Sequence, residues 1–269
     1  MSDVVVITGA SRSIGRQTCI KLLQKQALTV IAVARSGDAL ATLKTEAEAV
    51  SLRSGHKSQL ITVTGDIASS ATQDAVISAL HSAGGHLRAL INNAATLSPT
   101  GPVLENTAEQ WRAIWETNFL APVSLISRCL AFFRSHSDSR VILNITSSTS
   151  KGPVPGFGPY GSTKVALNYV TAAMAAEYPD ITSIAFYPGV VETPMNGSAL
   201  AAAYAFQKHA QETGNNAIDM SPVIAKLQNP ITPDLPSAIM ANLALRADAK
   251  LSGKYFVYSD EEMLPYTNK

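Results

Sequence analysis

The sequence predicts an α/β protein built around a doubly wound parallel sheet, and three observations support this prediction. Runs such as 4–8 and 28–34 are short, apolar and rich in β-branched residues, which is typical of central strands buried on both faces. Longer segments of helical character alternate with these runs, so that a strand–helix–strand–helix–strand unit fits within the first 64 residues. A glycine-rich turn at 9–15 joins the first run to the first helix. Because no linker divides the 269 residues, we expect a single domain over 1–269.

The same alternation continues to the end of the chain. The expected strands are 4–8, 28–34, 59–64, 89–92, 141–145, 181–187 and 255–258. The expected helices are a first one that ends near 25, then 38–52, 70–83, 108–134, one that carries 160–164 and ends near 177, and 235–246. Only the stretch 192–221 breaks the rhythm. Because crossovers between parallel strands are right-handed, we expect the strand order 3-2-1-4-5-6-7.

Charge and composition exclude several classes of protein. The formal net charge is +1 and the calculated pI is about 7.8, which gives no general attraction to nucleic acid or to an anionic membrane. No apolar run is long enough to span a bilayer, and the first expected strand begins too early for a signal peptide, so we expect a cytoplasmic protein. Cys19 and Cys129 are expected to be buried free thiols. The five His residues are scattered singly, so we expect no metal site.

Tyr160 and Lys164 are spaced to lie on one face of a helix, one turn apart. An ammonium beside a phenol favours the phenolate, so we expect the pKa of Tyr160 to fall from its usual value near ~10. A fall of ~3 units requires about 4 kcal/mol. One lysine rarely supplies that much, so a second cation would have to assist. Taken alone, the pair is better explained as part of an ordinary exposed helix face, and only the other features of the chain favour the catalytic interpretation.

The glycine-rich turn at 9–15 predicts a binding site for a diphosphate. In a strand–turn–helix context, backbone N–H groups and the helix dipole point at such an anion. Gly9 permits the tight turn, and Gly15 allows the helix to approach the strand.

With these two features in hand, the chain resembles the short-chain dehydrogenases/reductases over nearly its whole length. The motifs that carry the resemblance are Thr8-Gly9-x-x-x-Ser13-x-Gly15, Asp66-Ile67, Asn92-Asn93-Ala94, Asn118, Ser147, Tyr160-x-x-x-Lys164 and Pro188-Gly189-Val190-Val191-x-Thr193. Ser147 precedes Tyr160 by 13 residues, the usual interval of the family. Within the family, the segments 189–193 and 253–261 are most similar to fungal carbonyl reductases of the sepiapterin reductase and benzil reductase type. The implied fold is a Rossmann sheet with a small substrate lid at about 193–220.

Two positions depart from the family pattern. Ser13 stands where the family usually has Gly, which puts the approach of the backbone to the diphosphate in question, although a small Ser could fit and could cap the following helix. Ala95 follows Asn92-Asn93-Ala94 where Gly is commoner. We expect neither departure to abolish binding.

The resemblance implies a nicotinamide dinucleotide, and the residues after the second strand indicate which one. NAD-preferring members have an acid at that position, whereas this chain has Ala34 followed by Arg35. A guanidinium suits a 2′-phosphate, and Arg12 would hold its other side, so we expect NADP(H); the alternative is that Arg35 merely lies solvated at a strand end. The cofactor-binding residues that the resemblance implies are Gly9, Ser11, Arg12, Ser13, Ile14, Gly15, Arg35, Asp66, Ile67, Asn93, Tyr160, Lys164, Pro188, Gly189, Val191 and Thr193.

Some of these positions have a specific implied role. Asp66 would bind the adenine amino group and Ile67 would line the ring pocket, although Asp66 is nearly as well explained as a solvated turn residue. Asn93 would lie near the adenosine ribose. Val191 and Thr193 would contact the nicotinamide carboxamide.

The implied catalytic residues are Ser147, Tyr160, Lys164 and Asn118. Ser147 would position the substrate oxygen, Tyr160 would donate the proton, and Lys164 would lower the pKa of the phenol and hold the nicotinamide ribose. Composition alone would allow Ser148 in place of Ser147, and only the interval to Tyr160 selects between them. Asn118 would maintain a water-linked proton path, or would simply be a polar group inside a helix.

We therefore expect an NADPH-dependent reductase that acts on a small apolar carbonyl substrate, namely a ketone, an aldehyde or a diketone. One alternative is an alcohol, sugar-alcohol or steroid dehydrogenase that runs in the opposite direction. Another is a dinucleotide-sensing protein without turnover, against which the four retained catalytic residues argue. As partners we expect no nucleic acid and no membrane, and we expect a homodimer or homotetramer.

Overall fold

The computed structural model describes residues 3–133, 140–215 and 217–268. Within these residues, seven parallel strands form one sheet in the order β3-β2-β1-β4-β5-β6-β7, which confirms the predicted fold class and strand order. The strands are β1 (Asp3–Thr8), β2 (Leu28–Ala34), β3 (Gln59–Thr64), β4 (His86–Asn92), β5 (Val141–Ile145), β6 (Thr182–Tyr187) and β7 (Tyr255–Val257).

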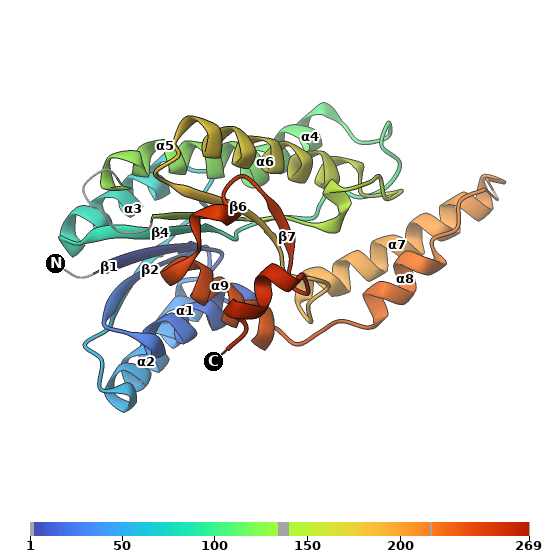
Figure 1. The fold of residues 1–269 in the computed structure, drawn as a ribbon. Coiled ribbons are helices and arrows are strands. Elements are labelled where there is room, and N and C mark those ends of the chain that lie inside the picture. The colour runs from blue at the N-terminus through green and yellow to red at the C-terminus, as the bar shows by residue number, and fades with distance from the viewer. Residues whose placement is uncertain (1–2, 134–139, 216, 269) are drawn as a thin grey trace.

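Helices cover both faces of the sheet (Figure 1). The helices are α1 (Ser13–Lys25), α2 (Gly37–Ser54), α3 (Ser70–Ala83), α4 (Ala108–Trp115), α5 (Ala121–Phe133), α6 (Gly158–Glu177), α7 (Pro194–Glu212), α8 (Ser221–Gln228) and α9 (Asp234–Arg246). In Figure 1, α1, α2 and α9 lie below the sheet, and α3 to α6 lie above it.

The uniformly apolar strands are explained by burial on both faces. In β1, Val5 and Ile7 belong to the cluster under α1, α2 and α9, whereas Val4 and Val6 belong to the cluster under α3 and α5. All four side chains are fully buried, and each such burial stabilises the fold by about 1.5–3 kcal/mol. Successive side chains along a strand point to opposite faces of the sheet. Because helices bury both faces, the strand is apolar throughout and shows no alternation of apolar and polar residues.

The helix expected over 108–134 is not continuous. A π-helical turn, Glu116–Leu120, separates α4 from α5, and residue 134 lies outside the described residues. Asn118 lies in this turn with its side chain fully buried. Single π-helical turns inside α-helices are rare and frequently occur at functional sites. Their hydrogen-bond pattern differs from the α-helix by one residue, which residue periodicity does not reveal.

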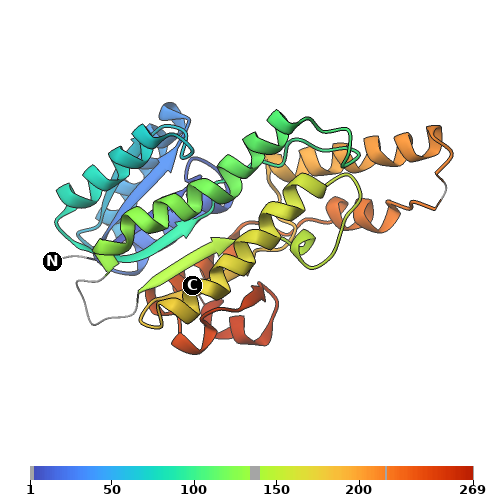
Figure 2. The same ribbon diagram turned by 90° about the horizontal axis from the view of Figure 1, so that it is seen from above.

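Helices α7 and α8 extend away from the sheet as an antiparallel pair (Figures 1 and 2). The Asn196 side chain donates a hydrogen bond to the carbonyl oxygen of Leu227 at 3.0 Å, which joins the two helices near their base. Their apolar residues, including Phe206 and Met220, pack in one cluster with Phe157 and Tyr160. Helix α8 lies mostly beyond the stretch 192–221 and was not among the expected elements.

None of the helices in the described part of the chain is long and apolar enough to cross a membrane. The described residues also contain no cluster of three His, Cys, Asp or Glu side chains that could hold a metal ion.

Candidate active site

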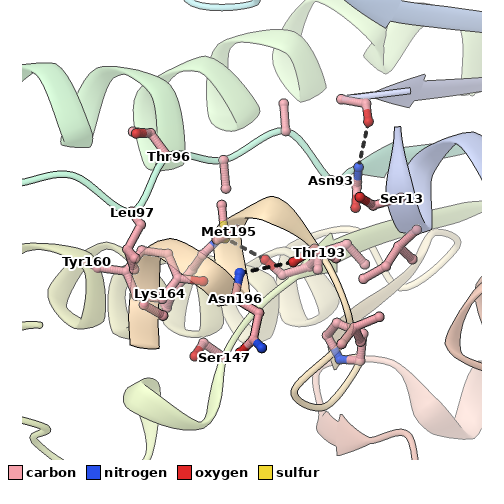
Figure 3. Close-up of a pocket in the computed structure, with 18 of the residues that line it drawn as sticks. Ser13, Asn93, Thr96, Leu97, Ser147, Tyr160, Lys164, Thr193, Met195 and Asn196 are labelled. Atoms are coloured by element: carbon pink, nitrogen blue, oxygen red, sulfur yellow. Dashed lines mark hydrogen bonds between the residues drawn. The ribbon is translucent and has the colours of Figure 1, made fainter. Parts of the chain in front are cut away.

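One cavity of about 1300 Å³ lies at the carboxyl ends of the strands, where open α/β sheets bind their ligands. It extends from Arg12 and Arg35, beside β1 and β2, to Met195 and Leu227 on α7 and α8. Figure 3 shows Ser13 and Asn93 at one end of this space and Ser147, Tyr160 and Lys164 at the other. Of the expected catalytic and cofactor-binding residues, Asn118 alone does not line this cavity.

The turn after β1 is built for close approach of backbone. Gly9 has φ +69°, and a Cβ on it would lie 2.9 Å from the Ala94 Cα atom. A Cβ on Gly15 would lie 2.4 Å from the Gly9 carbonyl oxygen. The Asn93 amide donates to the carbonyl oxygens of Thr8 and Gly9 at 2.9 and 3.2 Å, which fixes the turn from the neighbouring strand. Side chains are thus excluded from the region where a diphosphate would meet the N-terminus of α1.

Ser13 adopts the left-handed conformation that glycine normally occupies, with φ +51°. It is the first residue of α1, and the N-cap position belongs to Arg12, whose side chain makes no capping hydrogen bond. Ser13 therefore preserves the backbone path of the family's glycine at a steric cost of roughly 1–2 kcal/mol, and the cap that we considered for it is not formed.

The end of the cavity beside β1 and β2 carries positive charge. Arg12 and Arg35 are both exposed and line the cavity, and within the described residues neither forms an ion pair. Asp66 also lines the cavity, although its carboxylate accepts a hydrogen bond from the Ala68 N–H at 3.0 Å and so stabilises its own turn. Ile67, next to it, is buried and also lines the cavity.

Ser147 lies two residues after the end of β5, beside Tyr160 of α6. Its hydroxyl accepts a hydrogen bond from the Thr149 N–H at 3.2 Å, and a hydrogen bond between the Ser147 and Tyr160 side chains lowers the pKa of the phenol in part. This interaction is a physical reason to prefer Ser147 to Ser148. The sequence separated the two only by the interval to Tyr160.

The pKa of Tyr160 moves in the direction opposite to our expectation. Burial, as the largest effect, raises the pKa of Tyr160 to about 12, and the nearby Tyr187 adds to the increase. Lys164 does not counteract it, because its own ammonium is desolvated, and burial lowers the pKa of Lys164 to about 8. The Lys164 Nζ atom lies 5.6 Å from the centre of the Tyr160 ring and donates to the Ile145 carbonyl oxygen at 2.9 Å.

Asn118 links two segments that surround the cavity. Its amide oxygen accepts a hydrogen bond from the Thr96 N–H, and its amide nitrogen donates to the Thr96 carbonyl oxygen, both at 2.8 Å. The nitrogen also donates to the Thr163 hydroxyl at 3.3 Å. The side chain thus ties the loop after β4 to helix α6, which is the structural role we had weighed against a proton path.

The segment after β6 closes the cavity. Gly189 has φ +88°, and a Cβ on it would lie 2.6 Å from the Tyr258 ring. Val191 is buried and pairs with Ile231 in an isolated parallel bridge. Thr193 is the N-cap of α7 and accepts a hydrogen bond from the Asn196 N–H at 3.1 Å (Figure 3). Pro188, Gly189, Val191 and Thr193 all line the cavity.

The cavity also contains residues that we did not assign to the site. Tyr187, Lys151, Lys226 and Leu97 line it. Tyr187 ends β6 at the same edge of the sheet as Ser147, so the rule that polar residues at strand ends bind ligands would have found it. The sequence gives no such signal for Lys151 and Lys226. They line the cavity only because segments distant in the sequence pack around it.

Comparisons with known proteins agree with this geometry. The short chain dehydrogenase family matches residues 3–203. A benzil reductase, (S)-benzoin forming, of Saccharomyces cerevisiae is 28% identical, over 98% of this chain and 99% of its own. The enzyme of the same description from Bacillus cereus is 32% identical, over 71% of this chain and 76% of its own. Among solved structures, L-sorbose reductase from Gluconobacter frateurii, complexed with NADPH and L-sorbose, shares the fold with a TM-score of 0.76 at 22% identity, over 95% of this chain and 94% of its own. On the family match over most of its length, the chain belongs to the short-chain dehydrogenases/reductases and resembles the fungal benzil reductases.

Proposed function

We propose that the protein catalyses the NADPH-dependent reduction of an apolar ketone, aldehyde or diketone to the alcohol. The observation that carries this proposal is the meeting of Ser147, Tyr160 and Lys164 in the same cavity that the glycine-rich turn opens. The similarity to two benzil reductases, whose substrate is a diketone by name, supports the substrate class.

The residues present fit a dinucleotide. A side chain at Gly9 or Gly15 would collide with atoms of the turn and of the loop after β4, so the two glycines allow the close packing that leaves the turn on the wall of the cavity. The preference for NADP rests on Arg12 and Arg35, two exposed guanidinium groups on the cavity beside a strand end that carries Ala34 instead of an acid. Guanidinium groups bind phosphate through two parallel N–H bonds.

Tyr160 is the group that supplies the proton. A phenol with a pKa of about 12 is protonated at neutral pH, which suits donation to a carbonyl oxygen and therefore the direction of reduction. The chemistry that bound NADPH supplies is hydride donation to the carbonyl carbon. Ser147 donates to the same oxygen and orients it against Tyr160, and it stabilises the negative charge that develops there.

Lys164 has two tasks in this scheme. Its pKa of about 8 leaves it mostly protonated at pH 7, so its ammonium can donate to the hydroxyls of the nicotinamide ribose. Its hydrogen bond to the Ile145 carbonyl holds α6 against β5. Asn118 keeps the loop after β4 in place through its bonds to Thr96.

Residues of about 193–220, which form α7 and the chain that leads to α8, serve as the lid of the substrate end. Met195 and Ala199 of α7 and Leu227 of α8 line the cavity there, opposite Val154 and Phe157. These five side chains are apolar, which favours an apolar substrate over a phosphorylated sugar.

The test is to incubate the purified protein with NADPH and a panel of aryl ketones, aldehydes and 1,2-diketones while the loss of NADPH absorbance is followed. We expect turnover with at least one aryl ketone or diketone, and a lower kcat/KM with NADH. A protein that binds NADPH but oxidises it with no compound of the panel would contradict the proposal.

A further inference from the structure

Tyr187 is the last residue of β6 and leaves the sheet beside the strand that positions Ser147. Ile145 and Phe186 are partners in the register of β5 and β6, and the Thr146 N–H donates to the Phe186 carbonyl oxygen at 2.9 Å. Ile145 and Phe186 both belong to the apolar cluster on the side of α1 and α9. Because successive side chains alternate between the two faces, Tyr187 points to the opposite side, where α6 carries Tyr160.

The phenol of Tyr187 lies near that of Tyr160. Both residues line the cavity and both are mostly buried, with 7% and 9% of their surfaces exposed. Tyr187 also contributes to the raised pKa of Tyr160.

The hydroxyl of Tyr187 has no assigned task. Among the described residues it makes no hydrogen bond with another group, and it is not one of the fully buried polar atoms without a partner, so it is accessible from the cavity that Tyr187 lines. The ring is held by packing, with the Lys226 Nζ atom 5.7 Å from its centre, and a phenylalanine would serve that packing equally well. The unused O–H group is therefore available to a molecule in the cavity.

We propose that Tyr187 donates a hydrogen bond to a second substrate oxygen, adjacent to the carbonyl that Tyr160 protonates, and thereby selects 1,2-dicarbonyl and α-hydroxycarbonyl compounds over simple ketones. This inference rests on the proposed carbonyl reductase activity. In the reaction NADPH would supply the hydride that forms the new C–H bond at the carbonyl carbon, while the Tyr160 O–H bond breaks and its proton joins the carbonyl oxygen. The O–H bond of Tyr187 stays intact, because the carbon that carries the second oxygen is not reduced.

The experiment compares two substrates that share a carbon skeleton. Benzil has two adjacent carbonyl groups, and deoxybenzoin has the same two aryl rings with a single carbonyl. The kcat/KM for each is measured for the wild type, for Tyr187→Phe and for the control Tyr169→Phe, whose tyrosine is 77% exposed on α6. The inhibition constant of deoxybenzoin against benzil gives the same comparison without depending on its turnover. NADPH dissociation constants and melting temperatures verify that each variant is folded and binds the cofactor.

We expect Tyr187→Phe to lower kcat/KM for benzil by about tenfold more than for deoxybenzoin, the size of one lost hydrogen bond to a desolvated group. Its deoxybenzoin inhibition constant should remain within about twofold of the wild type, and Tyr169→Phe should match the wild type with both compounds. Equal losses with both substrates, or no loss with benzil, would overturn the role of Tyr187. A wild type that reduces neither compound nor any other carbonyl with NADPH would instead contradict the proposed function, so the two failures are distinguishable.

Discussion

The Lys164 ammonium donates a hydrogen bond to the carbonyl oxygen of Ile145 at 2.9 Å. Ile145 ends β5, and Ser147 follows two residues later, so one bond connects the helix of Tyr160 and Lys164 with the strand of Ser147. The helix and the strand are separate in sequence, yet the catalytic groups they carry are held in register by a buried contact. Lys164 is consequently a structural as well as a chemical residue.

The titration of Lys164 should appear in the stability of the protein. Its folded pKa of about 8 lies below the ordinary value of 10.5, so between these limits the unfolded chain binds more protons than the folded one. Stability therefore rises with pH across this interval and is lost as pH falls toward 8. We expect the free energy of unfolding of the wild type, measured relative to that of Lys164→Met, to rise by roughly 2 kcal/mol between pH 7 and pH 9.5.

Urea unfolding at pH 7, 8.5 and 9.5 measures this difference, and subtraction of the two proteins removes the titration of all other groups. A difference that is constant with pH would show that Lys164 has an ordinary pKa in the folded protein.

Replacement of Tyr160 by phenylalanine should abolish turnover while leaving the cofactor bound. The variant lacks the proton donor, and general acid catalysis contributes ~10²- to 10⁴-fold, so we expect kcat to fall by at least ~100-fold. The NADPH dissociation constant, followed by fluorescence, should stay within about threefold, because the ring remains in the cavity wall. Tyr169→Phe, on the exposed side of the same helix, is the matched control. Substantial residual reduction at neutral pH would assign the proton to another group.

Arg35→Asp should reverse the cofactor preference. An acid at the end of β2 repels a 2′-phosphate and accepts hydrogen bonds from ribose hydroxyls. We expect the NADPH dissociation constant to rise by about 10- to 100-fold relative to that of NADH, from the loss of a charge-assisted bond. Arg53→Asp, on the exposed end of α2 and outside the cavity, applies the same change in net charge as a control. If the dissociation constants of NADPH and NADH rise by the same factor, Arg35 does not bind the 2′-phosphate.

Substitution of Ser13 by glycine should relieve backbone strain. Its φ of +51° costs a side chain more than it costs glycine. Ser13→Gly removes the steric cost but gives the unfolded chain more freedom, so we expect a net gain of about 1 kcal/mol in the free energy of unfolding over Ser13→Ala, which keeps the Cβ. Thermal and urea unfolding of the three proteins without cofactor checks this. An alanine variant as stable as the glycine variant would mean that the left-handed backbone carries no penalty here.

The sequence by itself determined the sheet, the strand order and many of the residues that line the cavity. Uniformly apolar strands alternating with helices admit few topologies, because parallel strands need right-handed crossovers. Local spacing is enough to recognise the glycine-rich turn at 9–15 and the tyrosine–lysine pair one helical turn apart. Residues such as Arg35 and Thr193 follow strands, and strand ends converge on one edge of the sheet.

Only the tertiary structure decided the electrostatics and the contacts made between distant segments. The pKa of Tyr160 depends on how deeply α6 and the α7–α8 pair bury it, and that burial outweighs the lysine that local spacing places nearby. The Asn118 side chain donates hydrogen bonds to the Thr96 carbonyl oxygen and the Thr163 hydroxyl. It lies in a π-helical turn, which the periodicity of the sequence does not predict. Tyr187 meets Tyr160 because the register of two strands turns it toward α6. Desolvation and side-chain direction depend on everything packed around a residue, whereas spacing along a chain records only its near neighbours.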